Sequence, residues 1–343
     1  KETGKKYDTR SRFQLFNEIK KKNEDIKIVV FPATHLSETK KILPLSGVSN
    51  SETIFCNENG YYSIYNSDRY GFNNPDDEWD QKDIEYLLVG DSFTHGACVN
   101  RPNDIASVLR TLSNKSVLNL GYTSNGPLLE YATLREYLDV NVKKILWIYF
   151  EDNDLNELKK ELKDKILYKY FNDLNFSQNL KSKKKEIDIM INTTMEDEIF
   201  KKKEFEKNLG FKNFKKEFIQ IIKIYKTRNI IFNQTIIKPQ PKANNDFKIL
   251  LRLVNDLAIK NNSKLYFVYL PEYNRYLNDY DNSSYDSVKK IVNELKIPFI
   301  DIDQEVFKKE RNPLKLFPFK LNGHYNIAGY KKVSEVIYNN SMD

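Results

Sequence analysis

One stretch of sequence decides the fold: Ile84-Glu85-Tyr86-Leu87-Leu88-Val89-Gly90-Asp91-Ser92. Its first seven residues are mostly apolar and favour extended backbone, so they predict a buried strand that ends at Gly90. Turn-forming polar residues follow at once. Comparable short apolar runs recur along the chain, each separated from the next by helical spacing. The predicted strands are 84–90, 116–120, 144–150, 264–270 and 298–302, and the predicted helices are 103–112, 128–138, 247–260, 284–295 and 327–338.

Short apolar strands that alternate with helices are typical of a parallel sheet with helices on both faces. We therefore expect a three-layer α/β/α sandwich around a central, mainly parallel sheet. The alternation stops at about 155–242, where the sequence is lysine-rich and helical in spacing. Because this stretch lies between two predicted core strands, we expect a helical insertion. Residues 1–83 are predicted to form an N-terminal region of irregular and short-strand segments that packs on the domain formed by residues 84–343.

The composition restricts the class of protein. The chain has 343 residues, of which 40% are hydrophobic, enough for a sizeable core. Its net charge is +7, and the stretch 155–229, which contains 19 Lys and Arg and 12 Asp and Glu, accounts for all of it. Lysine runs such as 183–185 and 201–203 are typical of solvated helix faces, and no aromatic-and-basic motif predicts a nucleic-acid partner. No apolar run approaches the roughly 20 residues that span a bilayer.

The polar residues of interest lie where predicted strands end, which is where open parallel sheets bind ligands. Ser92 ends the first strand, Gly121 follows the second, and Asn153 follows the third, while His324 lies just before the last helix. A serine hydroxyl beside an imidazole is what nucleophilic acyl transfer requires, and the oxyanion needs preorganised donors. We predict Ser92 as nucleophile and His324 as base, with the amides of Ser92 and Gly121 and the side chain of Asn153 as oxyanion donors. A side chain at Gly121 would crowd that pocket.

Together these motifs resemble the SGNH or GDSL hydrolase superfamily. The matching residues are Gly90-Asp91-Ser92-Phe93 with Gly96, Asn119-Leu120-Gly121, Asn153-Asp154, and His324-Tyr325-Asn326 with Gly329; Ser67-Asp68-Arg69-Tyr70-Gly71-Phe72 resembles one bacterial branch. The resemblance implies a flavodoxin-like sandwich and the same nucleophile and base, with no metal and no cofactor. Members hydrolyse esters of lipids, acetylated sugars and other small acyl compounds, and some relatives transfer acetyl groups to glycans.

The chain departs from the family pattern at the acid. The family keeps an acid two or three residues before the histidine, where this chain has Leu321 and Asn322. Asn322 therefore occupies the usual acid position without a charge. His324 is expected to be oriented by the carbonyl of Asn322, by a backbone carbonyl in a Ser–His dyad, or by Asp301 or Asp303. A second departure is Asp152, which stands where a glycine commonly precedes the asparagine.

Other residues are expected to support the site. Asp91 is expected to tie the loop by accepting backbone N–H bonds, His95 to pack or to line the cleft, and Asp154 to line the cleft or to support the site. Cys56 and Cys98 are either two buried thiols or one disulfide. A disulfide would fasten the upstream segment to the helix that follows Ser92 and would indicate an oxidising compartment.

The expected function is that of a serine esterase acting on an O-acetyl or short-chain ester, on a small molecule or a glycan. The alternatives are a glycan O-acetyltransferase that uses the same site, a catalytically weakened glycan-binding protein, which Asn322 would favour, and a lipase with the insertion as a lid. We expect an exported protein, periplasmic, membrane-anchored or secreted, with the cytoplasm as the alternative. The chain opens with Lys1, which leaves room for an upstream signal or membrane anchor.

Overall fold

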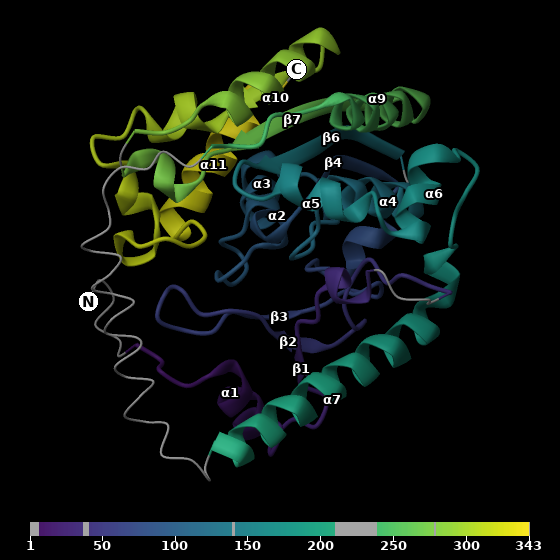
Figure 1. Cartoon of the computed structure of the whole chain (residues 1–343), viewed down its shortest axis with the longest axis vertical. Helices are drawn as coiled ribbons and strands as arrows, with labels where there is room; N and C mark the ends of the chain where they lie inside the picture. Colours follow the sequence, from purple (N-terminus) through teal and green to yellow (C-terminus); the bar gives the residue numbers. More distant parts are fainter. Residues whose placement is uncertain (1–6, 37–40, 139–140, 210–238, 278, 343) are drawn as a thin grey trace.

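The computed structural model describes residues 7–36, 41–138, 141–209, 239–277 and 279–342. Five parallel strands form its central sheet, in the order β5-β4-β6-β7-β8 (Figure 1). The strands are β4 (Asp83–Gly90), β5 (Val117–Asn119), β6 (Asn141–Phe150), β7 (Lys264–Leu270) and β8 (Phe299–Asp301). All five predicted strands are confirmed, as is the parallel sheet.

Side chains of each central strand alternate between two buried faces, which explains why the strands are almost continuously apolar. In β6, for example, Ile145 and Trp147 enter one apolar cluster, whereas Leu146 and Ile148 enter the other. The clusters are covered by helices whose bounds agree with the predictions to within a few residues. Helices α4 (Pro127–Tyr137), α9 (Asn245–Lys260) and α10 (Ser283–Glu294) cover one face, and α3 (Ile105–Ser113) and α11 (Ile327–Asn340) cover the other. The predicted α/β/α sandwich is confirmed.

The strand order places the site. Numbered by their order in the sandwich, the strands run 2-1-3-4-5, the flavodoxin-like order in which ligands bind where the winding reverses. That reversal lies between β4 and β6. Ser92 follows the end of β4, and Asn153 follows the end of β6, so the two lie at the same edge of the sheet.

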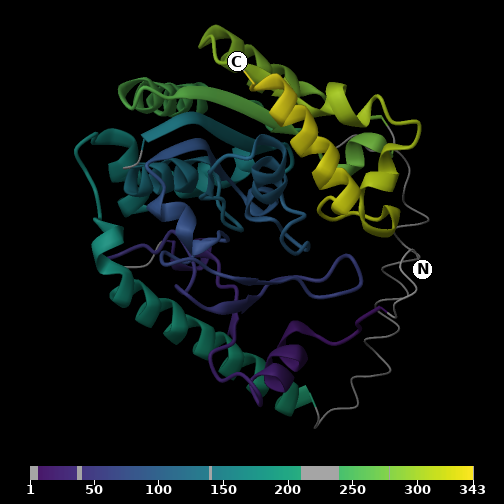
Figure 2. The ribbon, with the colours of Figure 1, turned by 180° about the vertical axis from the view of Figure 1, so that it is seen from behind.

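A second, smaller sheet precedes the sandwich. It contains β1 (Lys27–Ile28), β2 (Glu52–Ile54) and β3 (Ile64–Asn66), with β2 parallel to β1 and antiparallel to β3. Helix α1 (Arg12–Ile19) lies beside it, and its apolar residues continue the cluster that covers the α4 face of the central sheet. Figure 2 shows this N-terminal region on one side of the molecule, below the helices of the sandwich.

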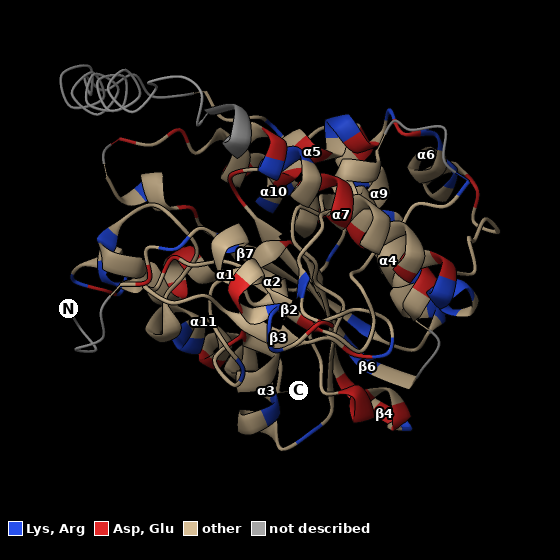
Figure 3. Ribbon diagram, turned by 90° about the horizontal axis from the view of Figure 1, so that it is seen from below, with Lys and Arg blue, Asp and Glu red and all other residues tan. Residues whose placement is uncertain are grey.

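The insertion is helical where the structure describes it, with α5 (Asp154–Glu161), α6 (Lys165–Asn172) and α7 (Lys184–Leu209). Ile187, Ile191 and Met195 form a buried stripe on α7, and Asp188 accepts hydrogen bonds from the amide and hydroxyl of Ser49 (2.9 and 2.6 Å). Helix α7 is thereby fixed along the N-terminal region (Figure 1). Its outer side carries both signs of charge (Figure 3). Residues 210–238 of the predicted insertion lie outside the described part.

None of the described helices combines the length and apolar character that crossing a membrane requires.

Candidate active site

Ser92 stands at the abrupt turn between β4 and the short helix α2 (Ser92–His95). Asp91 is the N-cap of α2, and its Oδ1 accepts the amide of Phe93 at 2.9 Å, the tie expected for this residue. Gly96 ends the helix with φ 87°, a backbone conformation that favours glycine. The turn leaves the Ser92 side chain half-buried at the edge of the sheet, at the start of a helix.

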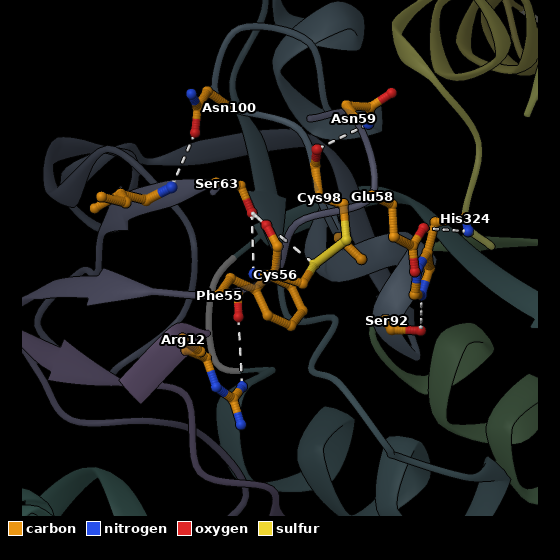
Figure 4. Close-up of a disulfide and its surroundings, with 12 residues drawn as sticks. Arg12, Phe55, Cys56, Glu58, Asn59, Ser63, Ser92, Cys98, Asn100 and His324 are labelled. Atoms are coloured by element: carbon orange, nitrogen blue, oxygen red, sulfur yellow. Dashed lines mark hydrogen bonds and ion pairs between the residues drawn. A yellow bond between two sulfur atoms is a disulfide. The ribbon is translucent and has the colours of Figure 1, made fainter. Parts of the chain in front are cut away.

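A chain of hydrogen bonds joins Ser92 to His324 and then to Glu58 (Figure 4). The hydroxyl of Ser92 lies 2.8 Å from His324 Nε2, and His324 Nδ1 lies 3.0 Å from Glu58 Oε1. The other carboxylate oxygen of Glu58 accepts the backbone amide of His324 at 2.6 Å. Because Nδ1 faces a carboxylate, it carries the ring proton, and Nε2 is left to accept from the serine. The arrangement is that of a serine–histidine–acid triad.

The position of the acid corrects the sequence prediction. Asn322 is exposed, and no hydrogen bond joins it to His324 among the described residues. Asp301 accepts from Tyr285 and Lys289, and Asp303 accepts from Tyr276. None of these three side chains is the partner of the imidazole, which is instead a glutamate from the N-terminal region.

Glu58 is held against His324 by shape and by charge. A Cβ on Gly323 would lie 2.6 Å from Glu58 Oε2, so the glycine before the histidine leaves room for the carboxylate. Partial burial acts to raise the pKa of Glu58, but the hydrogen bonds and charge of His324 outweigh it and lower the pKa below the ordinary value. Glu58 is therefore a carboxylate at neutral pH.

Gly121 does not hold the role predicted for it. Its amide donates to Asn119 Oδ1 at 2.8 Å, which removes it from the set of free oxyanion donors. The reason for glycine also differs, because a Cβ there would lie 2.4 Å from Thr94 Cβ. Gly121 thus permits close packing of the β5–α4 loop against α2 and leaves the oxyanion pocket to other groups.

One amide of the loop 121–126 is unengaged among the described residues, and it belongs to Ser124. The amides on either side donate to Gly90 O, His95 Nδ1, Tyr122 O and Glu161 Oε1. Ser124 has φ 62°, a conformation that non-glycine residues rarely adopt outside constrained sites. The loop lies against both ends of the turn that carries Ser92, so the Ser124 amide takes the place of Gly121 among the candidate donors.

Asn153 occupies the N-cap position of α5, but its side chain makes no capping hydrogen bond. Its Oδ1 is buried and has no hydrogen-bond partner among the described residues. Asp154, which follows it, is fully buried, and its Oδ2 accepts the amide of Phe150 at 2.9 Å. Asp154 therefore supports the turn after β6 and does not line a cleft.

Carboxyl groups are unusually buried beneath the turn. Burial raises the pKa of Asp91 to about 6, and burial together with the charge of Asp91 raises the pKa of Asp154 well above its ordinary value. Glu130 is also fully buried with a raised pKa. Burial and the neighbouring carboxyl groups therefore favour the neutral form of both Asp154 and Glu130.

A buried network explains the upstream motif that resembles one family branch. Asp68 accepts from the side chains of Asn74 and Trp79, each at 2.8 Å, and from the amides of Tyr70 and Phe72. Asn74 Oδ1 in turn accepts the backbone amide of Asn119. The side chain of Asn119 donates to a carbonyl of α2 and accepts the amide of Gly121. The motif is thus structural, since it connects the N-terminal region to the loops on either side of Ser92.

His95 packs in the interior, which is one of the two alternatives that the sequence left open. It is fully buried, stacks on Tyr122 with 4.4 Å between ring centroids, and also contacts Phe55 and Tyr65. Its Nδ1 accepts the amide of Thr123 at 3.2 Å. Burial, with a smaller contribution from the charge of His324, lowers its pKa to about 3, so the ring is neutral in the folded protein.

Cys56 and Cys98 form a disulfide, which settles the alternative that the sequence left open. Cys98 Sγ lies within 4.8 Å of ligand-type atoms of Glu58 and His324. Because this sulfur belongs to the disulfide, it is not a thiolate, and the trio lacks one of the three ligands a metal would need. Figure 4 shows the disulfide beside Glu58, between the N-terminal hairpin and the segment after Ser92.

No protein-family model matches the sequence, and no curated protein matches it. The chain is similar to solved structures of GDSL proteins. One is a member of the lipolytic G-D-S-L family from Veillonella parvula, at 11% identity and a TM-score of 0.40, over 75% of this chain and 97% of that one. Another is the acetyl xylan esterase AlAXEase, at 10% identity and a TM-score of 0.39, over 75% of this chain and 98% of that one.

Proposed function

We propose that this protein is a serine esterase that works through an acyl-enzyme on Ser92. The observation that carries the proposal is the continuous set of hydrogen bonds from Ser92 Oγ through His324 to Glu58, at 2.8 and 3.0 Å. Nucleophile, base and acid are each within hydrogen-bond reach of the next, which is the geometry that activates a hydroxyl. The acid at Glu58 also removes the ground for a catalytically weakened binding protein, which rested on Asn322.

In the first half of the reaction, Ser92 Oγ attacks the ester carbonyl while His324 Nε2 takes its proton. The imidazolium that forms donates its Nδ1 proton in a hydrogen bond to Glu58, which stabilises the positive charge without accepting the proton. The tetrahedral oxyanion is held by the amides of Ser92 and Ser124 and by the side-chain amide of Asn153. The imidazolium then protonates the leaving alcohol, and the acyl group stays on Ser92.

In the second half, His324 deprotonates a water, which attacks the acyl-enzyme. The same donors stabilise the second oxyanion, and the proton returns to Ser92 as the carboxylic acid leaves. Atoms and protons balance within the triad, the ester and one water.

We propose a short acyl chain, such as O-acetyl, on a carbohydrate. An exposed aromatic side chain near the turn that carries Glu58 supports a sugar ester: Phe319 is half exposed at φ 52°, and its ring lies near both Tyr7 and Gly60, which is two residues after Glu58. Residues held in rare backbone conformations cluster at active sites and ligand clamps, which supports a binding role for this ring. The disulfide supports an exported location, because such bonds persist in oxidising compartments.

The test is hydrolysis of p-nitrophenyl acetate by the wild type, by Ser92→Ala and by Ser182→Ala. Ser182 is an exposed serine whose hydroxyl bonds Asn179 O, so it is the matched control. The esterase proposal requires activity that is lost in Ser92→Ala, by about 10³-fold or more, and kept in Ser182→Ala. Equal rates in all three proteins would refute it. A rate that increases from acetyl to octanoyl esters would instead favour the lipase alternative.

A further inference from the structure

We propose that the Cys56–Cys98 disulfide is a positioning device for the catalytic acid, so that turnover depends on the disulfide through Glu58 and His324. The inference rests on the proposed esterase function. It assigns a role in the reaction to two residues that touch neither substrate nor reacting atoms.

Glu58 belongs to a turn, not to a strand or helix of the sandwich. The hairpin ladder of β2 and β3 continues through Phe55 N to Ser63 O and Ser63 N to Cys56 O, at 2.9 and 2.8 Å. The last paired residue before the turn is thus Cys56, and Glu58 follows it by two residues. A turn of this kind has no regular hydrogen bonds of its own to fix the direction of its side chains.

The other end of the disulfide belongs to the nucleophile. Cys98 follows α2 by three residues and is fully buried, with φ 60° in the left-handed region. Its neighbour Ala97 donates its amide to Ser92 O at 3.0 Å, which closes the turn that carries the nucleophile. The disulfide therefore joins the segment that bears the acid to the segment that bears Ser92, with a Cα–Cα distance of 4.9 Å.

Two hydrogen bonds also join the hairpin that carries Glu58 to the segment after Ser92. Asn59 Nδ2 donates to Cys98 O, and Ile64 N donates to Asn100 Oδ1, both at 2.9 Å. Both end on the segment just after Ser92, as the disulfide does (Figure 4). The carboxylate of Glu58 is partly open to water, with 30% of its side chain exposed. The disulfide is the only covalent link among these contacts, so its loss leaves the turn held by hydrogen bonds alone, which also include Asn57 Nδ2 to Asp8 O at 2.8 Å and Asp8 N to Gly60 O at 2.9 Å. We expect the turn to move more relative to His324 when only these bonds remain.

A small displacement is sufficient to matter. Glu58 holds His324 through two bonds at once, one to the ring and one to the amide, and both require the carboxylate to stay in one orientation. Misplacement of a catalytic group by about 1 Å costs on the order of 10²-fold in rate. We expect the loss to appear in kcat and not in KM, because the disulfide acts through the acid, whose charge stabilises the imidazolium formed in the transition state.

A double-mutant cycle tests the mechanism. The four proteins are the wild type, Glu58→Gln, Cys56→Ser/Cys98→Ser, and the triple variant, assayed on p-nitrophenyl acetate well below their unfolding temperatures. Removing the disulfide is expected to lower kcat about 10²-fold in the wild type but less than about threefold in the Glu58→Gln background. The second value follows because an acid that is already absent cannot be misplaced.

A merely structural disulfide gives a different result. It would lower kcat by the same factor in both backgrounds, and that outcome overturns the proposal, as does a folded disulfide-free protein with the kcat of the wild type. Ile191→Ala, in the buried stripe of α7, is the control for general destabilisation, and it should keep its kcat. If Ser92→Ala retains the activity, the esterase function itself has failed, which distinguishes that failure from the failure of this inference.

Reduction of the native protein supplies a second measurement if the serine variants do not fold. A phosphine reductant converts the disulfide to two thiols and is itself oxidised to the phosphine oxide, with water supplying the oxygen and protons. Near-ultraviolet circular dichroism follows the fold during the assay. The same cycle is expected: a large loss of kcat on reduction of the wild type and a small one for Glu58→Gln. Equal losses would again overturn the proposal.

Discussion

At the scale of single residues, Glu58, the proposed catalytic acid, is the residue whose replacement is most informative. In Glu58→Gln an amide faces His324 Nδ1, so the negative charge that stabilises the imidazolium is lost while the volume is kept. We expect kcat on p-nitrophenyl acetate to fall by on the order of 10³-fold, with KM changed less than about threefold. Asn322→Ala is the matched control, because Asn322 is exposed and makes no hydrogen bond to the ring among the described residues. A greater loss of kcat in Asn322→Ala than in Glu58→Gln would mean that Asn322, in the family's usual acid position, is the partner of His324 after all.

His95 predicts a pH dependence of stability. Its pKa falls from 6.5 when unfolded to about 3 when folded, so below pH 6.5 the unfolded chain binds a proton that the native state does not. The stability due to its neutral form is therefore complete above pH 6.5 and is lost as the pH falls toward 3. Between pH 7 and pH 5 the wild type should lose roughly 2 kcal/mol more free energy of unfolding in urea than His95→Phe does. Identical losses in the two proteins would contradict this account.

At the scale of elements, helix α7 offers a matched pair of substitutions. Ile191 is 2% exposed and packs on the N-terminal region, whereas Ile189, two residues earlier, is 68% exposed. Ile191→Ala leaves a cavity and should lower the free energy of unfolding by about 2–4 kcal/mol, while Ile189→Ala should change it by less than about 0.5 kcal/mol. Urea titrations measure both. Similar effects for the two would mean that α7 is not fixed by this stripe.

The elements were also the best predicted part of the molecule. The strand from 84 to 90 and its four partners follow from local apolar runs, since each strand is buried on both faces and needs no distant information. The N-terminal region was predicted only as irregular and short-strand segments, because strands of two or three residues are fixed by their partners and not by their own sequence.

At the scale of the whole molecule, the disulfide should also contribute to stability. It joins residues 42 apart in sequence, and closing a loop of that length in the unfolded chain is worth about 4 kcal/mol in the chain-entropy model. Reduced protein should show a lower urea midpoint, with a loss of about 2–4 kcal/mol in the free energy of unfolding. An unchanged midpoint would indicate that the unfolded chain is compact with or without the bond.

The acid was not predicted from the sequence because the pairing of Glu58 with His324 is a contact between residues that are far apart in the sequence. Glu58 is 266 residues from His324 in sequence, and no helix, strand or motif predicted from the sequence sets it apart from the 47 other acidic residues. Two signals pointed toward it: a cysteine two residues away that could pair near the nucleophile, and Gly323, whose missing side chain leaves the carboxylate room. The predicted role of Gly121 was wrong for a similar reason. The sequence shows that a glycine stands there, but it does not show whether the missing side chain leaves room for Thr94 or for an oxyanion.

The order of the three catalytic residues along the chain has a consequence for synthesis. Glu58, Ser92 and both cysteines lie at or before residue 98, whereas His324 follows Cys98 by 226 residues. A growing chain can therefore close the Cys56–Cys98 disulfide, which joins the segments that carry Glu58 and Ser92, before His324 has been made. Under the proposed esterase function, a chain that ends before His324 carries a disulfide-joined half-site that is inert toward esters.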